Sequence, residues 1–295
     1  MRVAIAGSSG FLGTALREHL RANGHSVVRL VRSEPSGADE SRWDPYAGTV
    51  DAALLGGCDV VVNLAGVPIA RLWTAKNRAA ILRSRVATTR TLATALAGLP
   101  EPPALLAQSG IDYYGDRGTE SVNESSPAGT GFLAEVVEKW EAATAPASAA
   151  GVRVCRLRTG VVLHPSGGAL QLMLVPFRLG VGGRLGSGRQ YMSALSLTDW
   201  VRAAYFLATT STASGAYNLV APHPPTNAEL TQELGRALHR PTKLLVPSFA
   251  LRKALGGLSS TLLGSLRAQP KRLTDAGFTF EHPDIAAILH AGLRS

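Results

Sequence analysis

The chain has 295 residues, 45% of them hydrophobic, and 30 basic against 21 acidic residues give a net charge of +9. This length suits one sizeable α/β domain with a smaller appended one. No apolar run reaches the roughly 18 residues that a membrane-spanning helix needs. The basic residues are mostly arginines spread along the chain, without the dense cluster typical of nucleic-acid binding. We therefore expect neither a membrane nor a nucleic-acid partner.

Two further features concern the setting of the protein. The chain starts directly in a strand pattern, so we expect no signal peptide and a cytoplasmic protein. Cys58 and Cys155 lie in or beside apolar runs and form no metal-ligand spacing. We expect both to be reduced thiols and expect no metal site.

The chain opens on an apolar run followed by three glycines, Gly7, Gly10 and Gly13. This pattern predicts a buried strand, a sharp turn and a helix over 11–22. Glycines allow the turn, the approach of a phosphate and the close packing of helix on strand, and the helix N-terminus attracts an anion. The pattern predicts a dinucleotide site, with a ligand-free turn as the alternative. We assign to it Gly7, Ser9, Gly10, Phe11, Leu12 and Gly13.

The second strand is expected at 26–31, and the residues after it read the adenosine ribose in doubly wound folds. An acidic residue there would favour NAD, but this chain has Arg32 and Ser33. Arg32 suits a 2′-phosphate, so we expect NADP(H), with Ser33 as a helper. The alternative for Arg32 is a solvated charge at a strand end.

The remaining elements alternate between strand and helix patterns. Strands are expected at 59–64, 104–108, 152–157, 161–163 and 215–220, and helices at 51–55, 75–97, 132–149, 167–179, 196–207 and 226–237. Small residues after the strand at 59–64 would let the chain pass beside the cofactor, and we assign Leu64, Ala65 and Gly66 to its site. The glycine-rich segment 180–189 is expected to be a loop over the site, or else an ordinary surface loop. Residues 240–295 show short helices and turns without chemistry.

This alternation predicts an α/β fold, a Rossmann-type doubly wound parallel sheet with a smaller C-terminal α+β substrate domain. We expect the NADP-binding domain at 1–162 and the substrate domain at 163–295. The segment 197–220 is expected to return to the first domain.

The segment 109–116 follows a central strand, where ligands meet an open α/β sheet. It carries a hydroxyl, a carboxylate and two phenols, all able to exchange protons with a carbonyl or alcohol. We take Ser109, Asp112, Tyr113 and Tyr114 as candidate catalytic residues, Ser109 also as a cofactor residue. Asp112 has an alternative role in capping a turn.

Several motifs together resemble an atypical, epimerase-like branch of the extended short-chain dehydrogenases/reductases with its own short C-terminal domain. They are Gly7–Gly13, Trp43-Asp44-Pro45, Asn63–Gly66, Ser84-Arg85 with Thr88-Thr89, Tyr113–Asp116, Trp140-Glu141, Leu157–Leu163, Gly186–Gln190 and Pro270–Leu273. The resemblance implies a Rossmann-type domain that holds NADP(H), and we assign Arg158 in the 157–163 motif to the cofactor. It is less specific for a reaction.

The superfamily's catalytic device is a Tyr-x-x-x-Lys pair, in which lysine lowers the pKa of the tyrosine. The matching helix here has Phe132 and Val136 at these positions. Members of the branch also tend to have glycine where this chain has Asp112, and Trp-x-His where it has 194–196. These departures indicate either a different substrate or neutral drift.

Two functions fit these residues. The first is an NADP(H)-dependent oxidoreductase or epimerase-like enzyme acting on a small polar carbonyl or alcohol, without the Tyr/Lys pair. The alternative is a catalytically silent NADP(H) sensor or partner-binding protein. The resemblance leaves open a monomer or a homodimer formed through the helices at 75–97 and 132–149.

Overall fold

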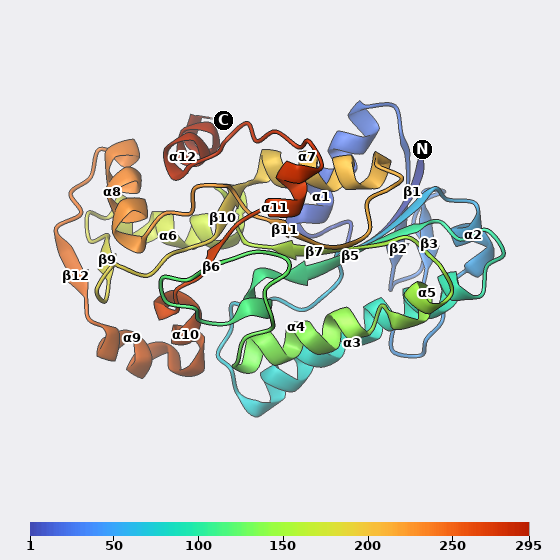
Figure 1. Ribbon diagram of the computed structural model, residues 1–295, viewed down its shortest axis with the longest axis horizontal. Helices are drawn as coiled ribbons and strands as arrows, with labels where there is room; N and C mark the ends of the chain where they lie inside the picture. The colour runs from blue at the N-terminus through green and yellow to red at the C-terminus, as the bar shows by residue number, and fades with distance from the viewer. Residues whose placement is uncertain (295) are drawn as a thin grey trace.

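A seven-stranded sheet forms the centre of the protein (Figure 1), whose computed structural model describes residues 1–294. In spatial order its strands are β3 (Glu40–Arg42), β2 (Ser26–Val31), β1 (Arg2–Ala6), β4 (Val60–Asn63), β5 (Ala104–Gly110), β7 (Val154–Thr159) and β11 (Gly215–Leu219). Every neighbouring pair is parallel. This is the strand order of a doubly wound dinucleotide-binding fold, so the predicted fold class is confirmed.

Helices cover both faces of the sheet (Figure 1). One layer contains α1 (Phe11–Ala22) and α7 (Leu197–Thr209), and the opposite layer contains α2 (Ala52–Gly56), α3 (Ala75–Ala97), α4 (Phe132–Ala142) and α5 (Ala145–Ala149). Alternate residues of a strand point to opposite faces of the sheet. In β1, Val3 and Ile5 pack in the core with α1, while Ala4 and Ala6 pack in the core with α3. Burial on both faces explains why these strands are almost continuously apolar.

Smaller elements extend the chain beyond the sheet. They are η1 (Ile111–Tyr114), β6 (Ser121–Val122), β8 (Val161–His164), α6 (Gly168–Arg178), β9 (Gly183–Leu185), β10 (Ala194–Ser196), α8 (Asn227–Leu238), β12 (Leu244–Val246), α9 (Ser248–Leu255), η2 (Gly256–Leu258), α10 (Ser259–Leu263), β13 (Arg267–Ala268), α11 (Lys271–Asp275) and α12 (Ile285–Arg294). Short parallel pairs join β8 with β10, β9 with β12 and β6 with β13. The division near residue 162 remains a prediction, but α7 and β11 lie in the layers of the main sheet, where we expected 197–220 to return.

Three expected elements differ from the structure. The helix expected over 132–149 is two helices, α4 and α5, and Pro146 lies in the first turn of α5. A proline is tolerated in the first turn of a helix, whereas in a helix interior it removes a hydrogen bond and clashes with the preceding turn. A short edge strand, β3 (Glu40–Arg42), is not among the expected strands. The segment 180–189, expected to be a loop, contains the strand β9, which pairs with β12. The two strands approach closely, because a Cβ added at Gly183 would lie 2.2 Å from the carbonyl oxygen of Leu244.

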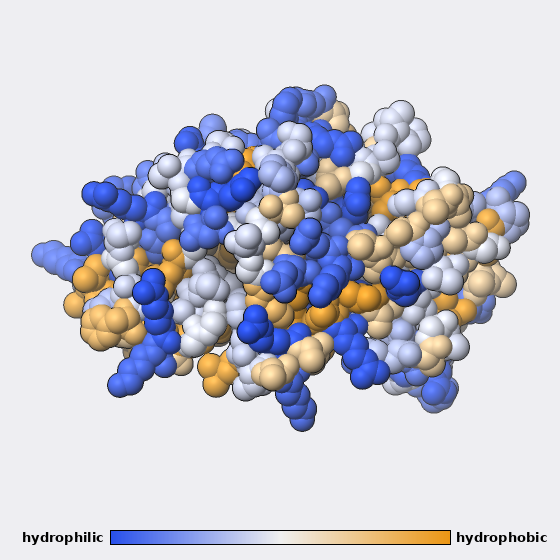
Figure 2. All heavy atoms as spheres, turned by 60° about the horizontal axis from the view of Figure 1, so that its bottom comes forward, coloured by the Kyte–Doolittle hydropathy of each residue, from blue (hydrophilic) through white to orange (hydrophobic). Residues whose placement is uncertain are grey.

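Hydrophilic residues cover most of the face shown in Figure 2, and its orange patches include the end where β12 and α9 lie. The large apolar side chains exposed at this end belong to Leu244, Leu245 and Phe249. Within residues 1–294, none of the helices combines the length and the apolar character needed to cross a bilayer.

Candidate functional site

The glycine turn between β1 and α1 is held by close backbone contacts. Gly7 has a φ of +80°, a conformation that favours glycine, and a Cβ there would lie 2.8 Å from the carbonyl carbon of Leu64. A Cβ on Gly13 would lie 2.2 Å from the carbonyl oxygen of Gly7. These two glycines therefore serve the close packing of the turn against β4 and of α1 against the turn.

Gly10 differs from its two neighbours in the motif. A Cβ there would meet one atom, the carbonyl oxygen of Gly7 at 3.4 Å. Gly10 is also the N-cap of α1 and supplies no side chain to the first N–H groups of the helix. Ser9 and Gly10 are both exposed. The turn thus leaves space and free N–H donors where an anion can bind, which fits a dinucleotide phosphate.

The two apolar residues assigned to this motif lie differently. The aromatic ring of Phe11 packs against Gly167 and Gly168, where added Cβ atoms would lie 2.7 and 3.2 Å from it. Leu12 is partly buried against the core beneath α1. Their side chains contribute packing, and their backbone N–H groups belong to the first turn of α1, which leaves such groups without an intrahelical acceptor.

Arg32 follows the last residue of β2 and is exposed, as is Ser33. In the described part of the chain, Arg32 makes no hydrogen bond or ion pair, whereas its neighbours do. Arg29 pairs with Asp39 and Glu40, and Arg42 pairs with Glu34. Arg32 is thus a free cation at the same sheet edge as the glycine turn.

The loop after β4 is held by hydrogen bonds from polar side chains on one face of α3. Asn63 donates to Thr89 at 2.9 Å and accepts from the N–H of Ala65 at 3.1 Å. Thr88 donates to the carbonyl of Ala65, and Ser84 accepts from the N–H of Val67. The buried polar residues of α3 therefore hold Leu64, Ala65 and Gly66 in place beside Gly7.

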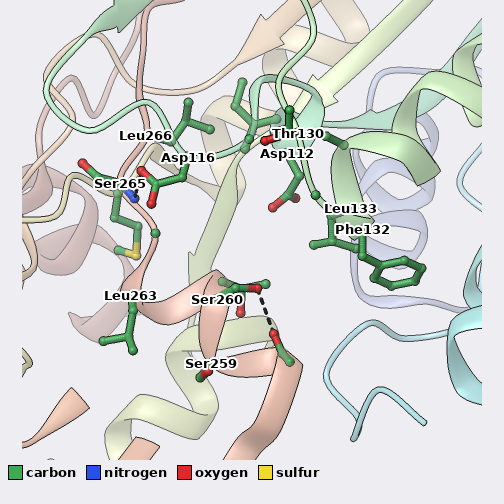
Figure 3. Close-up of a pocket in the computed structure, with 18 of the residues that line it drawn as sticks. Asp112, Asp116, Thr130, Phe132, Leu133, Ser259, Ser260, Leu263, Ser265 and Leu266 are labelled. Atoms are coloured by element: carbon green, nitrogen blue, oxygen red, sulfur yellow. Dashed lines mark hydrogen bonds between the residues drawn. The ribbon is translucent and has the colours of Figure 1, made fainter. Parts of the chain in front are cut away.

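A cavity of about 650 Å³ lies between the carboxyl ends of β5 and β7 and the C-terminal segment. The Asp112 carboxylate points into it, as Figure 3 shows, while the ring of Phe132 points away. One part of the wall is apolar and the other is rich in hydroxyl groups. Its hydroxyl-bearing residues are Thr130, Tyr191, Ser193, Ser259, Ser260, Thr261 and Ser265.

Asp112 is the first carboxylate after β5 and lies in η1. Burial raises the pKa of this carboxyl, and the positive charge of Arg85 opposes the shift in part. The second carboxylate of the cavity, Asp116, instead accepts hydrogen bonds from the N–H groups of Gly118 and Ser265. Asp112 is therefore the group in this cavity that is best suited to carry a proton.

Three predicted site residues belong to a buried network on the other side of η1. Ser109 donates to Glu141 at 2.6 Å, and Arg158 forms two 2.8 Å hydrogen bonds with the same carboxylate. Arg158 also donates to the hydroxyl of Tyr114, which donates to Asn218. None of the three lines the cavity. In the structure Ser109, Tyr114 and Arg158 connect β5, β7 and α4, and their contacts with substrate or cofactor stay a prediction.

Tyr113 also differs from expectation. Its ring stacks on the guanidinium of Arg158 at 3.5 Å, and it is absent from the cavity wall. Burial raises the pKa of the Tyr114 phenol, which makes that phenol a weaker acid. Of the four candidate catalytic residues, the cavity contains Asp112.

The positions of the usual Tyr/Lys pair lie on α4. Phe132 borders the cavity, and its ring packs edge-on against Trp73 at 5.0 Å. Val136 is buried, 2% exposed. Neither side chain can exchange a proton, so this helix contributes shape and apolar surface.

The residues that line the cavity differ in part from those that the sequence suggested. Residues 180–189 do not line it, whereas 252–266, where we expected no chemistry, form a large part of its wall. The residues at 194–196 lie in β10, are buried and do not line it either. The serines at 259, 260 and 265 gave a weak signal, because serines are common in loops and turns.

Comparison with known proteins gives the family. A model of the NAD dependent epimerase/dehydratase family matches residues 3–219, and a domain of unknown function, DUF1731, matches residues 246–291. Epimerase family protein Mb2239 of Mycobacterium bovis is 46% identical over 97% of this chain and 96% of its own length.

A solved structure is similar over its whole length. The human epimerase family protein SDR39U1, crystallised with NADPH, has a TM-score of 0.91 at 35% identity and covers 100% of both chains. The same protein from Bos taurus is 39% identical over 98% of each chain. Since the family model and these relatives span most of the sequence, the chain belongs to the NAD dependent epimerase/dehydratase family.

Proposed function

We propose that the protein is an NADP(H)-dependent oxidoreductase or epimerase-like enzyme acting on a small polar carbonyl or alcohol. One observation carries the proposal. A partly buried carboxyl, Asp112, points into a cavity at the same edge of the sheet as an open glycine turn and a free arginine. Ligands of doubly wound sheets bind at this edge.

The cofactor assignment rests on residues whose placement fits a phosphorylated dinucleotide. The free N–H groups beside Gly10 would bind the pyrophosphate, and Arg32 would bind a 2′-phosphate. The loop Leu64–Gly66 would border the bound nucleotide. The NADPH bound to human SDR39U1 supports the choice of the phosphorylated form. When bound, NADPH and a proton reduce a carbonyl to an alcohol and leave NADP⁺, and the reverse reaction oxidises the alcohol.

Asp112 supplies the proton in this proposal. Because burial raises the pKa of the carboxyl, it keeps its proton to a higher pH than an exposed aspartate and can donate it to a carbonyl oxygen. In the reverse direction the carboxylate accepts the proton of the alcohol. Asp112 thereby takes the role that the tyrosine has in typical members.

The cavity favours a substrate of modest size with several hydroxyl groups. Its volume of about 650 Å³ lies within the range of small-molecule sites. The serine hydroxyls of the C-terminal segment donate to the backbone carbonyls of Gly256, Gly257 and Gly118, so their oxygens remain as acceptors for substrate hydroxyls. The exposed Arg252 also lines the cavity, and its side chain makes no hydrogen bond or ion pair with another described residue. The apolar wall near Val161 and Leu266 would pack against carbon–hydrogen faces.

The second candidate is an NADP(H)-binding sensor without turnover. Phe132 and Val136 favour it, because a binding protein does not need the Tyr/Lys pair. A sensor must bind NADPH and NADP⁺ with different affinities, since a ligand shifts a conformational equilibrium only through differential binding. Equal affinities together with turnover would exclude it.

The test is NADPH oxidation measured with a panel of hydroxylated aldehydes and ketones. Asp112→Asn should lower turnover by about 100-fold or more, the usual contribution of a positioned proton donor, with NADPH affinity nearly unchanged. Asp116→Asn is the matched control, since this carboxylate borders the same cavity but is bonded to backbone N–H groups. Equal turnover in wild type and Asp112→Asn, or no turnover with any member of the panel, would contradict the proposal.

A further inference from the structure

Arg85 is a buried cation without a carboxylate partner. Its side chain is 7% exposed and lies on α3, beneath the loop after β4. Among the described residues, its hydrogen bonds are made by Nη1 alone, to the carbonyls of Val67 and Ile81. Nε and Nη2 of the guanidinium make none. A buried arginine normally forms an ion pair with a carboxylate. Because Arg85 has no such partner, its positive charge at this position needs another explanation.

Two elements of the site lie against this guanidinium, and a third is coupled to it by charge. A Cβ on Gly66, in the loop assigned to the cofactor, would lie 3.6 Å from Nη1 of Arg85. The ring of Trp140, on α4, lies 5.0 Å below the guanidinium. The third element is η1, because the charge of Arg85 acts on the Asp112 carboxyl.

The contact with Trp140 relates Arg85 to the missing lysine. Trp140 lies four residues, one helical turn, after Val136, on the same buried face of α4. Val136 stands where the family's lysine would project from that face. Arg85 therefore brings a positive charge from α3 to the region that the lysine would have reached from α4.

We propose that Arg85 replaces this lysine as the fixed cation of the site, which rests on the proposed function above. Arg85 is a positioning residue with two effects. Its unused N–H groups donate to the sugar oxygens of a nucleotide bound along the Leu64–Gly66 loop, and its charge holds the Asp112 carboxyl in a state from which it can both give and take a proton.

The electrostatic surroundings agree with this role. Burial lowers the pKa of Arg85 to about 10, and the Asp112 charge opposes the shift. Arg85 therefore remains charged at neutral pH. The charged groups of the cavity wall are Asp112, Asp116 and Arg252. Arg85 is not one of the lining residues, but within the described residues it is the one charge that acts on the Asp112 carboxyl.

The experiment compares Arg85→Met and Arg85→Lys with wild type. Arg90→Met is the control, because Arg90 lies on the same helix but is exposed. Two quantities are measured, the dissociation constant of NADPH by fluorescence titration and the pKa of Asp112 by carboxyl-carbon NMR of the nucleotide-free protein. The second readout does not depend on turnover.

Arg85→Met should weaken NADPH binding by about 10- to 100-fold, as expected for the loss of charge-assisted hydrogen bonds, and should raise the pKa of Asp112. Arg85→Lys keeps the positive charge, so it should restore part of the NADPH affinity and bring the pKa of Asp112 back toward the wild-type value. If Arg85 had only a structural role, lysine would restore neither quantity. The control should match wild type.

The outcomes separate the two proposals. A wild-type protein that does not bind NADPH contradicts the proposed function itself. A wild-type protein that binds NADPH, with Arg85→Met unchanged in affinity and in the pKa of Asp112, overturns the role of Arg85 alone. A fall in affinity for Arg85→Met that Arg85→Lys does not reverse also overturns it.

Discussion

The pair of Arg158 and Glu141 gives the sharpest stability prediction. The two side chains are 6% and 7% exposed, and two hydrogen bonds of 2.8 Å join them. Burial opposes the charge of Arg158, but hydrogen bonding to Glu141 and the charge of that carboxylate outweigh burial and raise the pKa of Arg158. Arg158→Met would leave the carboxylate buried and uncompensated.

Breaking a buried ion pair from one side costs about 3–5 kcal/mol. Solvent screening does not reduce this figure much, because both groups are almost fully buried. At roughly 2–4 °C per kcal/mol for a large domain, the melting temperature should fall by roughly 6–20 °C. The double variant Arg158→Met/Glu141→Met should recover most of the loss, although Ser109 and Tyr114 would each lose a partner.

The assay is thermal and urea unfolding of both variants, with Arg90→Met as an exposed control. NADPH affinity is measured at a temperature where each variant is folded. An Arg158→Met protein that keeps wild-type stability but no longer binds NADPH would refute this reasoning. It would return Arg158 to the cofactor site, where the sequence had placed it.

Three further predictions concern the turn, the cofactor and Asp112. Gly10→Ala should fold normally yet lose NADPH affinity, whereas Gly13→Ala, whose Cβ would lie 2.2 Å from the carbonyl oxygen of Gly7, should lose affinity and about 1–3 kcal/mol of stability; equal melting temperatures would contradict the difference. Arg32→Ala should weaken NADPH binding by about 10- to 100-fold and NADH binding far less, and an equal effect on both would contradict the 2′-phosphate assignment. The folded protein holds the Asp112 proton to a higher pH than the unfolded chain does, so this group's contribution to stability falls as pH rises from the ordinary aspartate range through the raised pKa. Asp112→Asn should therefore gain stability over wild type as pH rises, and a difference independent of pH in urea unfolding would contradict the raised pKa.

The sequence predicted the sheet well because its strands are buried on both faces. The run at 60–62 is three valines, and small residues follow it at 65 and 66. The glycine turn has a spacing that is typical of dinucleotide sites. The edge strand β3 escaped prediction because its three residues, Glu40–Arg42, are largely polar and gain their order from pairing with β2. The break at Pro146 was a readable signal that we did not use.

The candidate site was only partly readable. Proximity to a strand end suggested Ser109, Asp112, Tyr113 and Tyr114 alike, but side chains around η1 point in different directions. Asp112 enters the cavity while Tyr114 is buried against Asn218. A difference in side-chain direction between residues two positions apart in a tight turn is beyond what a sequence pattern can show.

Arg85 escaped prediction for a different reason. Polar residues at 84, 85, 88 and 89 share one face of α3, and on a surface helix such a face is usually solvated. Here the face is turned inward against the β4 loop and α4. The amount of buried polar surface on α3 depends on packing between distant segments, which the local sequence does not reveal.

Titration of the purified protein with NADPH, NADP⁺, NADH and NAD⁺, followed by fluorescence and calorimetry, tests the central claim most directly. The account predicts binding of all four, with the phosphorylated pair about 10- to 100-fold tighter because of the contact with Arg32. Binding of none of the four would contradict the nucleotide site at the glycine turn, and with it the proposed function.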